Sequence, residues 1–203
     1  DRRRVRDRIT LLEKELKSLS EARKQRKQRR VEKRIPIVSI IGYTNAGKST
    51  LLNSLTRSEV FVEEKMFATL DTASRRLRFP KERDVIITDT VGFIRDLPKD
   101  LMTAFKSTLE ELQDADLLLH LVDISNPRFE QHIASVEKIL SDLNLSEKRK
   151  MLVFNKADKI EREEAENIAQ RYNAFCISAL DKRTFQPLLH SIEEKVFGLT
   201  EKI

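Results

Sequence analysis

Apolar residues from position 36 onward fall into two patterns that alternate along the chain. One is a short continuous run, as at 117–122, which is typical of strands buried on both faces of a sheet. The other places apolar residues three and four positions apart, as in amphipathic helices. The patterns predict strands at 37–41, 74–79, 84–89, 116–123, 150–155 and 174–178, and helices at 48–56, 99–113, 128–142, 161–171 and 184–197.

The alternation of strands and helices predicts the fold class. Strand–helix units in series favour a doubly wound, mostly parallel sheet, here of six strands, with helices on its faces. Ligands bind such α/β sheets at the carboxyl ends of the strands. We therefore expect an α/β domain over residues 36–203, with functional residues directly after its strands.

Residues 1–34 show a third pattern, a heptad-like one. They contain no Gly or Pro, and five apolar residues recur at alternating steps of four and three, which places them on one stripe of a helix. Since Pro36 disfavours helix at the residue before it, we predict one long basic α-helix in a separate segment, residues 1–35. We expect its stripe to pack, over residues 5–19, on a domain missing from this sequence or on a second helix. The stripe consists of Val5, Ile9, Leu12, Leu16 and Leu19.

Positive charge is concentrated in that segment. The net charge of the chain is +6, but residues 1–34 contain 15 Lys and Arg against 6 Asp and Glu, which gives +9. The remaining 169 residues hold 24 against 27, which gives −3. The basic run at 23–30 is either a solvated helix face or a surface that contacts RNA. Because it lacks the aromatic residues that stack on bases, contact with RNA would be made to the phosphates.

Composition narrows the class of protein further. No stretch approaches the roughly 20 apolar residues of a membrane-spanning helix, so we expect no membrane association. The single cysteine, Cys176, lies in an apolar run and is predicted to be a small buried hydrophobe. His120 also lies in an apolar run and is predicted to be a core histidine rather than a base. Because the chain begins at Asp1 without Met, we expect it to be part of a longer protein.

The strongest chemical signal is the sequence Gly-Tyr-Thr-Asn-Ala-Gly-Lys-Ser at 42–49, which fits the phosphate-binding pattern G-x-x-x-x-G-K-[ST] between a strand and a helix. Its glycines let the backbone approach phosphates, so that N–H groups and the helix N-terminus face negative charge. We expect Lys48 at the β- and γ-phosphates and the Ser49 hydroxyl on Mg²⁺. The predicted phosphate-binding residues are Gly42, Tyr43, Thr44, Asn45, Ala46, Gly47, Lys48, Ser49 and Thr50.

A second motif, Asp-Thr-Val-Gly, begins at the end of the predicted strand 84–89. Asp89 stands 41 residues after Lys48, at a strand tip where an Asp of a P-loop protein reaches Mg²⁺. The N–H of Gly92 can then meet the γ-phosphate. The motif predicts Asp89 as a metal residue and Gly92 as a residue of the phosphate chemistry.

A third motif, Asn-Lys-Ala-Asp at 155–158, indicates the base. The Asp158 carboxylate can accept hydrogen bonds from N1–H and the exocyclic amine of guanine, whereas adenine has no such pair of donors. Asn155 can bind the guanine edge and the loop, and the stem of Lys156 can lie over the purine. These three residues predict a guanine nucleotide.

The end of the last predicted strand completes the base site. The sequence Ser-Ala-Leu begins 23 residues after Asn155. A backbone N–H in this segment can meet guanine O6. The predicted residues are Ser178, Ala179 and Leu180.

In this order, the motifs resemble those of the guanine-nucleotide domain of Ras-like, translation-factor-type GTPases, over about residues 36–198. More narrowly, the sequences at 42–50, 67–71, 89–94 and 122–127 look like those of the HflX family, and residues 1–4 resemble its linker into the nucleotide domain. HflX-type proteins are ribosome-associated GTPases that bind the large subunit and are implicated in rescuing or splitting stalled ribosomes. They also carry an N-terminal glycine-rich domain, which this sequence lacks.

The resemblance implies Mg²⁺-dependent hydrolysis of GTP to GDP and phosphate. It also implies Thr69, in Phe-Ala-Thr-Leu, as the residue that closes on the metal and the γ-phosphate, with Thr72 as its nearest competitor. The implied catalytic residues are then Lys48, Thr69 and Gly92, and the implied metal residues are Ser49, Thr69 and Asp89.

One position departs from many Ras-like proteins, which place a water-orienting glutamine after the glycine of the second motif. Here that position is Phe93, whose side chain can neither donate a hydrogen bond to a water nor accept one. We therefore expect slow intrinsic hydrolysis that a partner stimulates.

The resemblance further implies the ribosome or ribosomal RNA as that partner, a monomeric protein, and a location in the bacterial cytoplasm or, alternatively, an organelle matrix. A second hypothesis is a guanine-nucleotide-dependent RNA-binding module whose basic helix carries the function. Deleting residues 1–34 would distinguish the two, because RNA binding through basic side chains depends steeply on salt.

Overall fold

The computed structural model describes residues 35–56, 74–80, 83–90 and 110–198. The chain divides into two compact units, Asp1–Ile35 and Pro36–Ile203, and every described strand and helix belongs to the second. Residues 1–34 of the basic helix predicted at 1–35 lie outside the described residues. The division into a linker helix and a nucleotide domain therefore stays a prediction.

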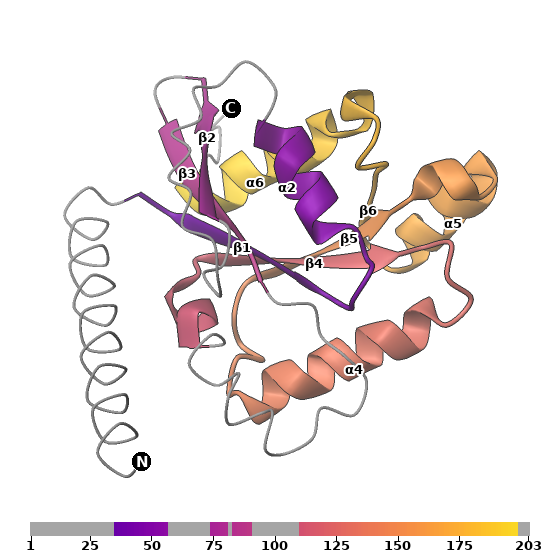
Figure 1. Ribbon diagram of the computed structural model, residues 1–203, viewed down its shortest axis with the longest axis horizontal. Helices are drawn as coiled ribbons and strands as arrows, with labels where there is room; N and C mark the ends of the chain where they lie inside the picture. Colours follow the sequence, from indigo (N-terminus) through magenta and orange to yellow (C-terminus); the bar gives the residue numbers. More distant parts are fainter. Residues whose placement is uncertain (1–34, 57–73, 81–82, 91–109, 199–203) are drawn as a thin grey trace, which may run out of the picture. The chain divides into compact units, whose positions relative to one another are not determined.

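A six-stranded sheet forms the centre of the second unit (Figure 1). Neighbouring strands run parallel except for β2, which is antiparallel to β3. The prediction of a mostly parallel six-stranded sheet is thus confirmed. The spatial order is β2 (Ser74–Phe79), β3 (Arg83–Asp89), β1 (Ile37–Gly42), β4 (Leu117–Asp123), β5 (Lys150–Asn155) and β6 (Phe175–Cys176).

Helices cover both faces of this sheet, as the doubly wound fold class requires. Side chains of α2 and α6 share one apolar cluster with the sheet, and α4 and α5 pack in two clusters on the opposite face. The helices are α2 (Lys48–Thr56), α4 (Phe129–Asp142), α5 (Arg162–Arg171) and α6 (Gln186–Phe197), with short 3-10 helices η1 (Glu110–Asp114), η2 (Ala157–Lys159) and η3 (Lys182–Thr184). None of these helices is long and apolar enough to cross a bilayer, within the residues that the structure describes.

The central position of β4 in the sheet explains why its sequence is a continuous apolar run. Leu119 and Leu121 lie in the cluster with α2 and α6, whereas Leu118 packs with α4 and Val122 with α5. Successive side chains of a strand point to opposite faces. Because both faces are covered by helices, both sets of alternate residues must be apolar.

The strand register brings the carboxyl ends of the parallel strands to one edge of the sheet. Ile40 near the end of β1 pairs with Asp89 at the end of β3, and Asp123 at the end of β4 pairs with Asn155 at the end of β5. Segments that lie more than a hundred residues apart in the chain therefore meet at this edge, where ligands bind in such folds.

The last strand is shorter than predicted. β6 consists of Phe175–Cys176 rather than 174–178, because the chain turns immediately afterwards. The N–H of Asp181 donates to the carbonyl of Ser178 at 2.9 Å, and these two residues form an isolated antiparallel bridge. The predicted end of the strand is a tight turn at the carboxyl edge of the sheet.

Two predicted helices also differ from the structure. The helix predicted from residue 184 begins at Gln186, because Thr184 ends η3 and Pro187 lies in the first turn, where proline is tolerated. Of the helix predicted at 99–113, only the last residues are described, and these belong to the 3-10 helix η1. The other predicted strands and helices begin and end within one residue of the prediction.

Candidate nucleotide-binding site

The phosphate loop leaves β1 in a backbone conformation that only glycine adopts without strain. Gly42 has φ 155°, and a Cβ there would lie 2.3 Å from the carbonyl oxygen of Leu121 on β4. Gly47 has φ 94°, and its Cβ would lie 2.4 Å from Nδ2 of Asn155. Both glycines of the motif are therefore required by neighbouring segments as well as by their own backbone.

Lys48 is folded back against its own loop. Its Nζ donates to the carbonyl of Tyr43 at 3.2 Å, and the residue is buried. Burial lowers the pKa of the ammonium, and the nearby carboxylate of Asp89 opposes that effect. Among the described residues, one weak hydrogen bond holds the charge at the loop, so an anion in the loop can replace the carbonyl as its partner.

Ser49 and Asp89 form the predicted metal pair. The Ser49 hydroxyl donates to Oδ2 of Asp89 at 2.5 Å, and Oδ1 of Asp89 is buried with no hydrogen-bond partner among the described residues. Burial raises the pKa of this carboxyl, against the effects of Ser49 and Lys48. A hydroxyl beside a carboxylate with a free buried oxygen is a donor set that suits Mg²⁺.

Asn155 joins the phosphate loop to the base segment. Its Nδ2 donates to the carbonyl of Ala46 and its Oδ1 accepts the N–H of Ala179, both at 2.8 Å. The side chain is 1% exposed. A buried amide with both ends satisfied fixes the distance between the two segments.

Lys156 is held by a residue for which the sequence predicted no role. Its backbone is left-handed (φ 65°), and its Nζ donates to Oδ2 of Asp123 at 2.7 Å. The other carboxylate oxygen of Asp123 accepts the N–H and the hydroxyl of Ser125. Burial acts to raise the pKa of Asp123, but the bonds from Lys156 and Ser125 outweigh it, so the pKa lies below its ordinary value. The available signal was a carboxylate ending the strand beside β5.

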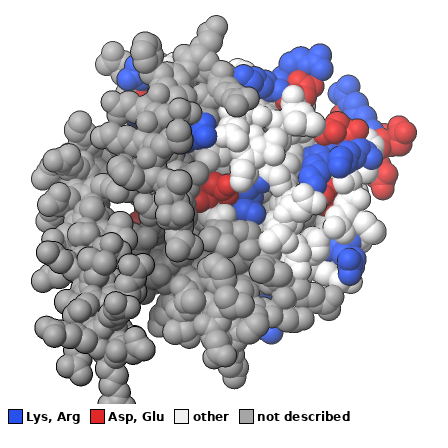
Figure 2. All heavy atoms as spheres, viewed as in Figure 1, with Lys and Arg blue, Asp and Glu red and all other residues white. Residues whose placement is uncertain are grey.

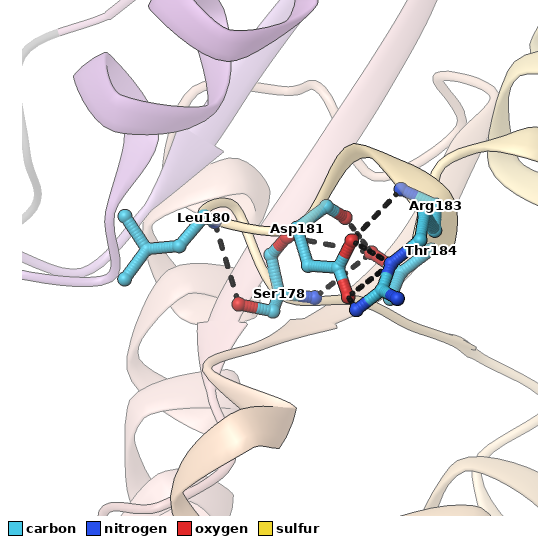
Figure 3. Close-up of polar contacts among 5 residues, drawn as sticks. All are labelled: Ser178, Leu180, Asp181, Arg183 and Thr184. Carbon is cyan, nitrogen blue, oxygen red and sulfur yellow. Dashed lines mark hydrogen bonds and ion pairs between the residues drawn. The ribbon is translucent and has the colours of Figure 1, made fainter.

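The predicted base segment, Ser178 to Leu180, forms a closed turn (Figure 3). The Ser178 N–H donates to the hydroxyl of Thr184 at 3.1 Å, and the Ala179 N–H is taken by Asn155. The Leu180 N–H has only a 3.3 Å contact with the Ser178 hydroxyl. Of the three N–H groups predicted for guanine O6, that of Leu180 is the least engaged.

The remaining predicted site residues divide into exposed ones and ones outside the described residues. Thr44, Asn45 and Thr50 are exposed in or after the phosphate loop, and Asp158 is exposed in the first turn of η2. Thr69, Thr72, Gly92 and Phe93 lie outside the described residues.

The weaker chemical candidates do not form sites. His120 is buried in β4, with its Nδ1 3.8 Å from Oε1 of Glu137 on α4, which confirms its prediction as a core histidine. Cys176 is half-buried rather than buried, and burial and Glu166 raise its pKa, so the thiolate is disfavoured. The described residues contain no cluster of His, Cys, Asp and Glu suited to a metal.

A family model described as "50S ribosome-binding GTPase" matches residues 37–156, more than half of the chain. The match spans the phosphate loop, Asp89 and the start of the Asn155 motif. The chain therefore belongs to this family of P-loop GTPases.

Within that family the chain belongs with the HflX GTPases, as its motifs suggested. It is 49% identical over 203 residues to GTPase HflX of Caldanaerobacter subterraneus subsp. tengcongensis, covering 100% of this chain and 46% of that protein. The chain thus spans less than half the length of this relative. A second relative, GTPase HflX of Magnetococcus marinus, is 42% identical over 97% of this chain and 46% of its own length.

Among solved structures, the chain is similar to a GTP-binding protein from Sulfolobus solfataricus in complex with GDP. The TM-score is 0.62 with 28% identity, over 89% of this chain and 58% of the other. It is also similar to Era in complex with MgGDPNP and nucleotides 1506–1542 of 16S ribosomal RNA. There the TM-score is 0.56 with 27% identity, over 79% of this chain and 56% of that one.

Proposed function

We propose that this chain binds GTP and hydrolyses it to GDP and phosphate. The observation that carries the proposal is the pair of 2.8 Å hydrogen bonds by which Asn155 joins the phosphate loop to the base segment. One buried amide thereby holds two binding segments at a fixed spacing, as a site for a single nucleotide requires. Membership of a GTPase family and the GDP bound to the Sulfolobus protein support the same ligand.

The phosphates would lie in the loop of residues 42–50, with its backbone N–H groups and Lys48 as their partners. Lys48 would exchange the Tyr43 carbonyl for the β- and γ-phosphates. Mg²⁺ held by Ser49, Asp89 and Thr69 would neutralise phosphate charge during transfer. The buried Oδ1 of Asp89, which has no hydrogen-bond partner among the described residues, supports this assignment.

The guanine base would lie beyond the phosphate loop, between segments that follow β5 and β6. Asp158 would accept the N1–H and exocyclic amine of guanine, and the stem of Lys156 would cover one face of the ring. The Leu180 N–H would meet O6. ATP would leave Asp158 unpaired, so we expect it to be rejected by a polar mismatch rather than by size.

We further propose that the partner is the ribosome, through its large subunit. The description of the family model names the 50S subunit, which supports the large subunit, and the Era complex contains 16S ribosomal RNA, which supports a ribosomal partner in general. Phe93 in place of a water-orienting glutamine supports slow hydrolysis of GTP that the partner accelerates. The N–H of Gly92 would bind the γ-phosphate. A monomer in the bacterial cytoplasm, or in an organelle matrix, completes the proposal.

On the face shown in Figure 2, Lys and Arg are interspersed with Asp and Glu over the described surface. Residues 35–203 carry a net charge of −3, whereas residues 1–34 carry +9. Contact with RNA phosphates would accordingly fall to the N-terminal segment, with the nucleotide domain acting as the switch.

Base selectivity tests the proposed nucleotide directly. We expect wild-type protein to bind fluorescent GDP and GTP analogues and not the ATP analogue. Asp158→Asn should weaken guanine nucleotides by about two orders of magnitude, since the carboxylate acceptor is lost. It should at the same time favour xanthine nucleotides, which carry an acceptor where guanine has its amine. Unchanged guanine selectivity in the variant would falsify the role of Asp158.

A further inference from the structure

One hydroxyl group closes the base segment on itself. Oγ1 of Thr184, at the end of η3, accepts the N–H of Ser178 at 3.1 Å and lies 2.7 Å from the carbonyl of Asp181, to which it donates. Figure 3 shows these contacts within one turn of the chain. The Thr184 side chain therefore links the start of the turn to its end.

A second set of contacts in this turn, the ion pair of Asp181 with Arg183, is exposed to solvent. The Asp181 carboxylate accepts the N–H of Arg183 at 3.0 Å and three bonds from its guanidinium at 2.8, 2.9 and 3.2 Å. The Arg183 side chain is 90% exposed. Exposed ion pairs contribute little, so we assign the order of the turn to the Thr184 hydroxyl rather than to Arg183.

The hydroxyl determines which backbone donor stays accessible. The Ser178 N–H donates to Thr184 and the Ala179 N–H donates to Asn155. Of these three N–H groups, only that of Leu180 makes no more than a long, weak hydrogen bond. Leu180 is 79% exposed and is the one large apolar residue so exposed among the described residues. The turn thus presents a donor and an apolar surface at the same residue.

We propose that Thr184 is a positioning residue for guanine recognition. Through Ser178, its hydroxyl holds the turn so that the Leu180 N–H faces guanine O6. Thr184 itself touches no nucleotide. The inference rests on the proposed function, because it concerns how the same site reads its base.

Thr184→Val is the direct test, because valine keeps the shape of threonine and removes every hydrogen bond of the hydroxyl, including its 3.3 Å contact with the carbonyl of Ser178. We expect the variant to bind GDP about tenfold more weakly, as the N–H of the buried Ser178 loses its hydrogen-bond partner. Binding of the 2-aminopurine riboside diphosphate, which lacks O6, should change less than twofold. At saturating GTP, kcat should also change less than twofold.

Matched variants separate positioning from general damage to the fold. Thr184→Ser restores the hydroxyl and should bring GDP affinity back to within about twofold of wild type. Arg183→Met breaks only the exposed ion pair with Asp181 and should change GDP affinity less than twofold. Thr184→Ala, which lacks the hydroxyl without the extra methyl, should behave as Thr184→Val does.

Two results would overturn the inference: wild-type GDP affinity in both variants without the hydroxyl, or equal weakening of GDP and the 2-aminopurine nucleotide. The second result would mean that the whole site is damaged and not the contact with O6. Failure of the wild-type protein to bind GDP would instead overturn the proposed function, and this inference with it. The wild-type measurement therefore distinguishes the two failures.

Discussion

At the scale of single residues, Asn155 shows how one side chain sets the identity of another. A Cβ added to Gly47 would lie only 2.4 Å from Nδ2 of Asn155. The second glycine of the phosphate loop is therefore required by a residue more than a hundred positions later. The hydrogen bonds of Asn155 to Ala46 and Ala179 fix that amide in place. The loop motif and the base motif are therefore one structural unit.

Asp123 is the second residue whose role depends on a contact. Asp123→Asn keeps the shape of the side chain but removes the charge that holds Lys156 at 2.7 Å. Since both side chains are largely buried, we expect GDP binding to weaken about tenfold as the lysine stem loses its fixed position over the base. Titration with a fluorescent GDP analogue measures the change.

Glu166→Gln is a suitable control for Asp123→Asn, because it breaks the exposed Arg162–Glu166 pair on α5, which contains no predicted nucleotide-binding residue. It should leave GDP affinity unchanged. If both variants bind GDP as the wild type does, the Asp123–Lys156 pair has no part in binding the base.

At the scale of elements, α4 connects the sheet to the phosphate loop. The ring of His132 on α4 stacks on that of Tyr43 in the loop, with centroids 3.9 Å apart and planes within 4°. One turn further along α4, Glu137 accepts a 2.5 Å hydrogen bond from Lys150 at the start of β5 and faces the buried His120. A polar contact thus holds the helix against an otherwise apolar face.

The Glu137 contact predicts a dependence of stability on pH. His120 and Lys150 lower the pKa of Glu137 from 4.5 to about 2, against the effect of burial. A lowered carboxyl pKa stabilises the fold above about pH 4.5, and this contribution is lost as the pH falls towards 2. Because the side chain is 42% exposed, solvent screening reduces the contribution to about 1 kcal/mol.

Glu137→Gln should therefore lower the free energy of unfolding by about 1 kcal/mol at pH 7. The difference from wild type should shrink as the pH falls from 4.5 towards 2. Urea unfolding of both proteins at pH 7, 5, 4 and 3 measures it. A difference that stays constant across this range would show that Glu137 acts by packing and not by its charge.

At the scale of the whole molecule, the prediction concerns turnover and its partner. Because Phe93 stands in the sequence where many Ras-like proteins have a water-orienting glutamine, we expect the isolated chain to hydrolyse GTP at a rate nearer ~10⁻⁴ s⁻¹ than the several per second of stimulated enzymes. Large ribosomal subunits should accelerate it and small subunits should not. Single-turnover phosphate release, with and without each subunit, gives the rates.

Deletion of residues 1–34 separates docking from chemistry in the same assay. If the basic segment binds RNA phosphates, the deletion should weaken ribosome binding and flatten its salt dependence, while stimulated turnover at saturating subunits persists. Rapid hydrolysis by the isolated chain would contradict the role given to Phe93. Binding that is insensitive to the deletion would contradict the role given to the basic segment.

Much of this organisation could be predicted because it is local. Continuous apolar runs such as that of β4 need only the rule that a doubly covered strand is apolar on both faces. The phosphate loop could be predicted from residue types, since its glycines and Lys48 stand within a few positions of one another in the sequence. The predicted start of α6 and end of β6 were wrong, because a turn held by Thr184 and Asp181 depends on contacts that periodicity does not contain.

The sequence by itself determined the class of fold and the family, and it predicted a set of nucleotide-binding residues, because each of these follows from local pattern and motif order. Only the tertiary structure decided how those residues are held: Asn155 between two loops, Asp123 on Lys156, and Thr184 on Ser178. The physical reason is the parallel register, which brings the ends of distant strands to one edge. Which side chains meet there depends on distances in space that spacing along the chain does not give.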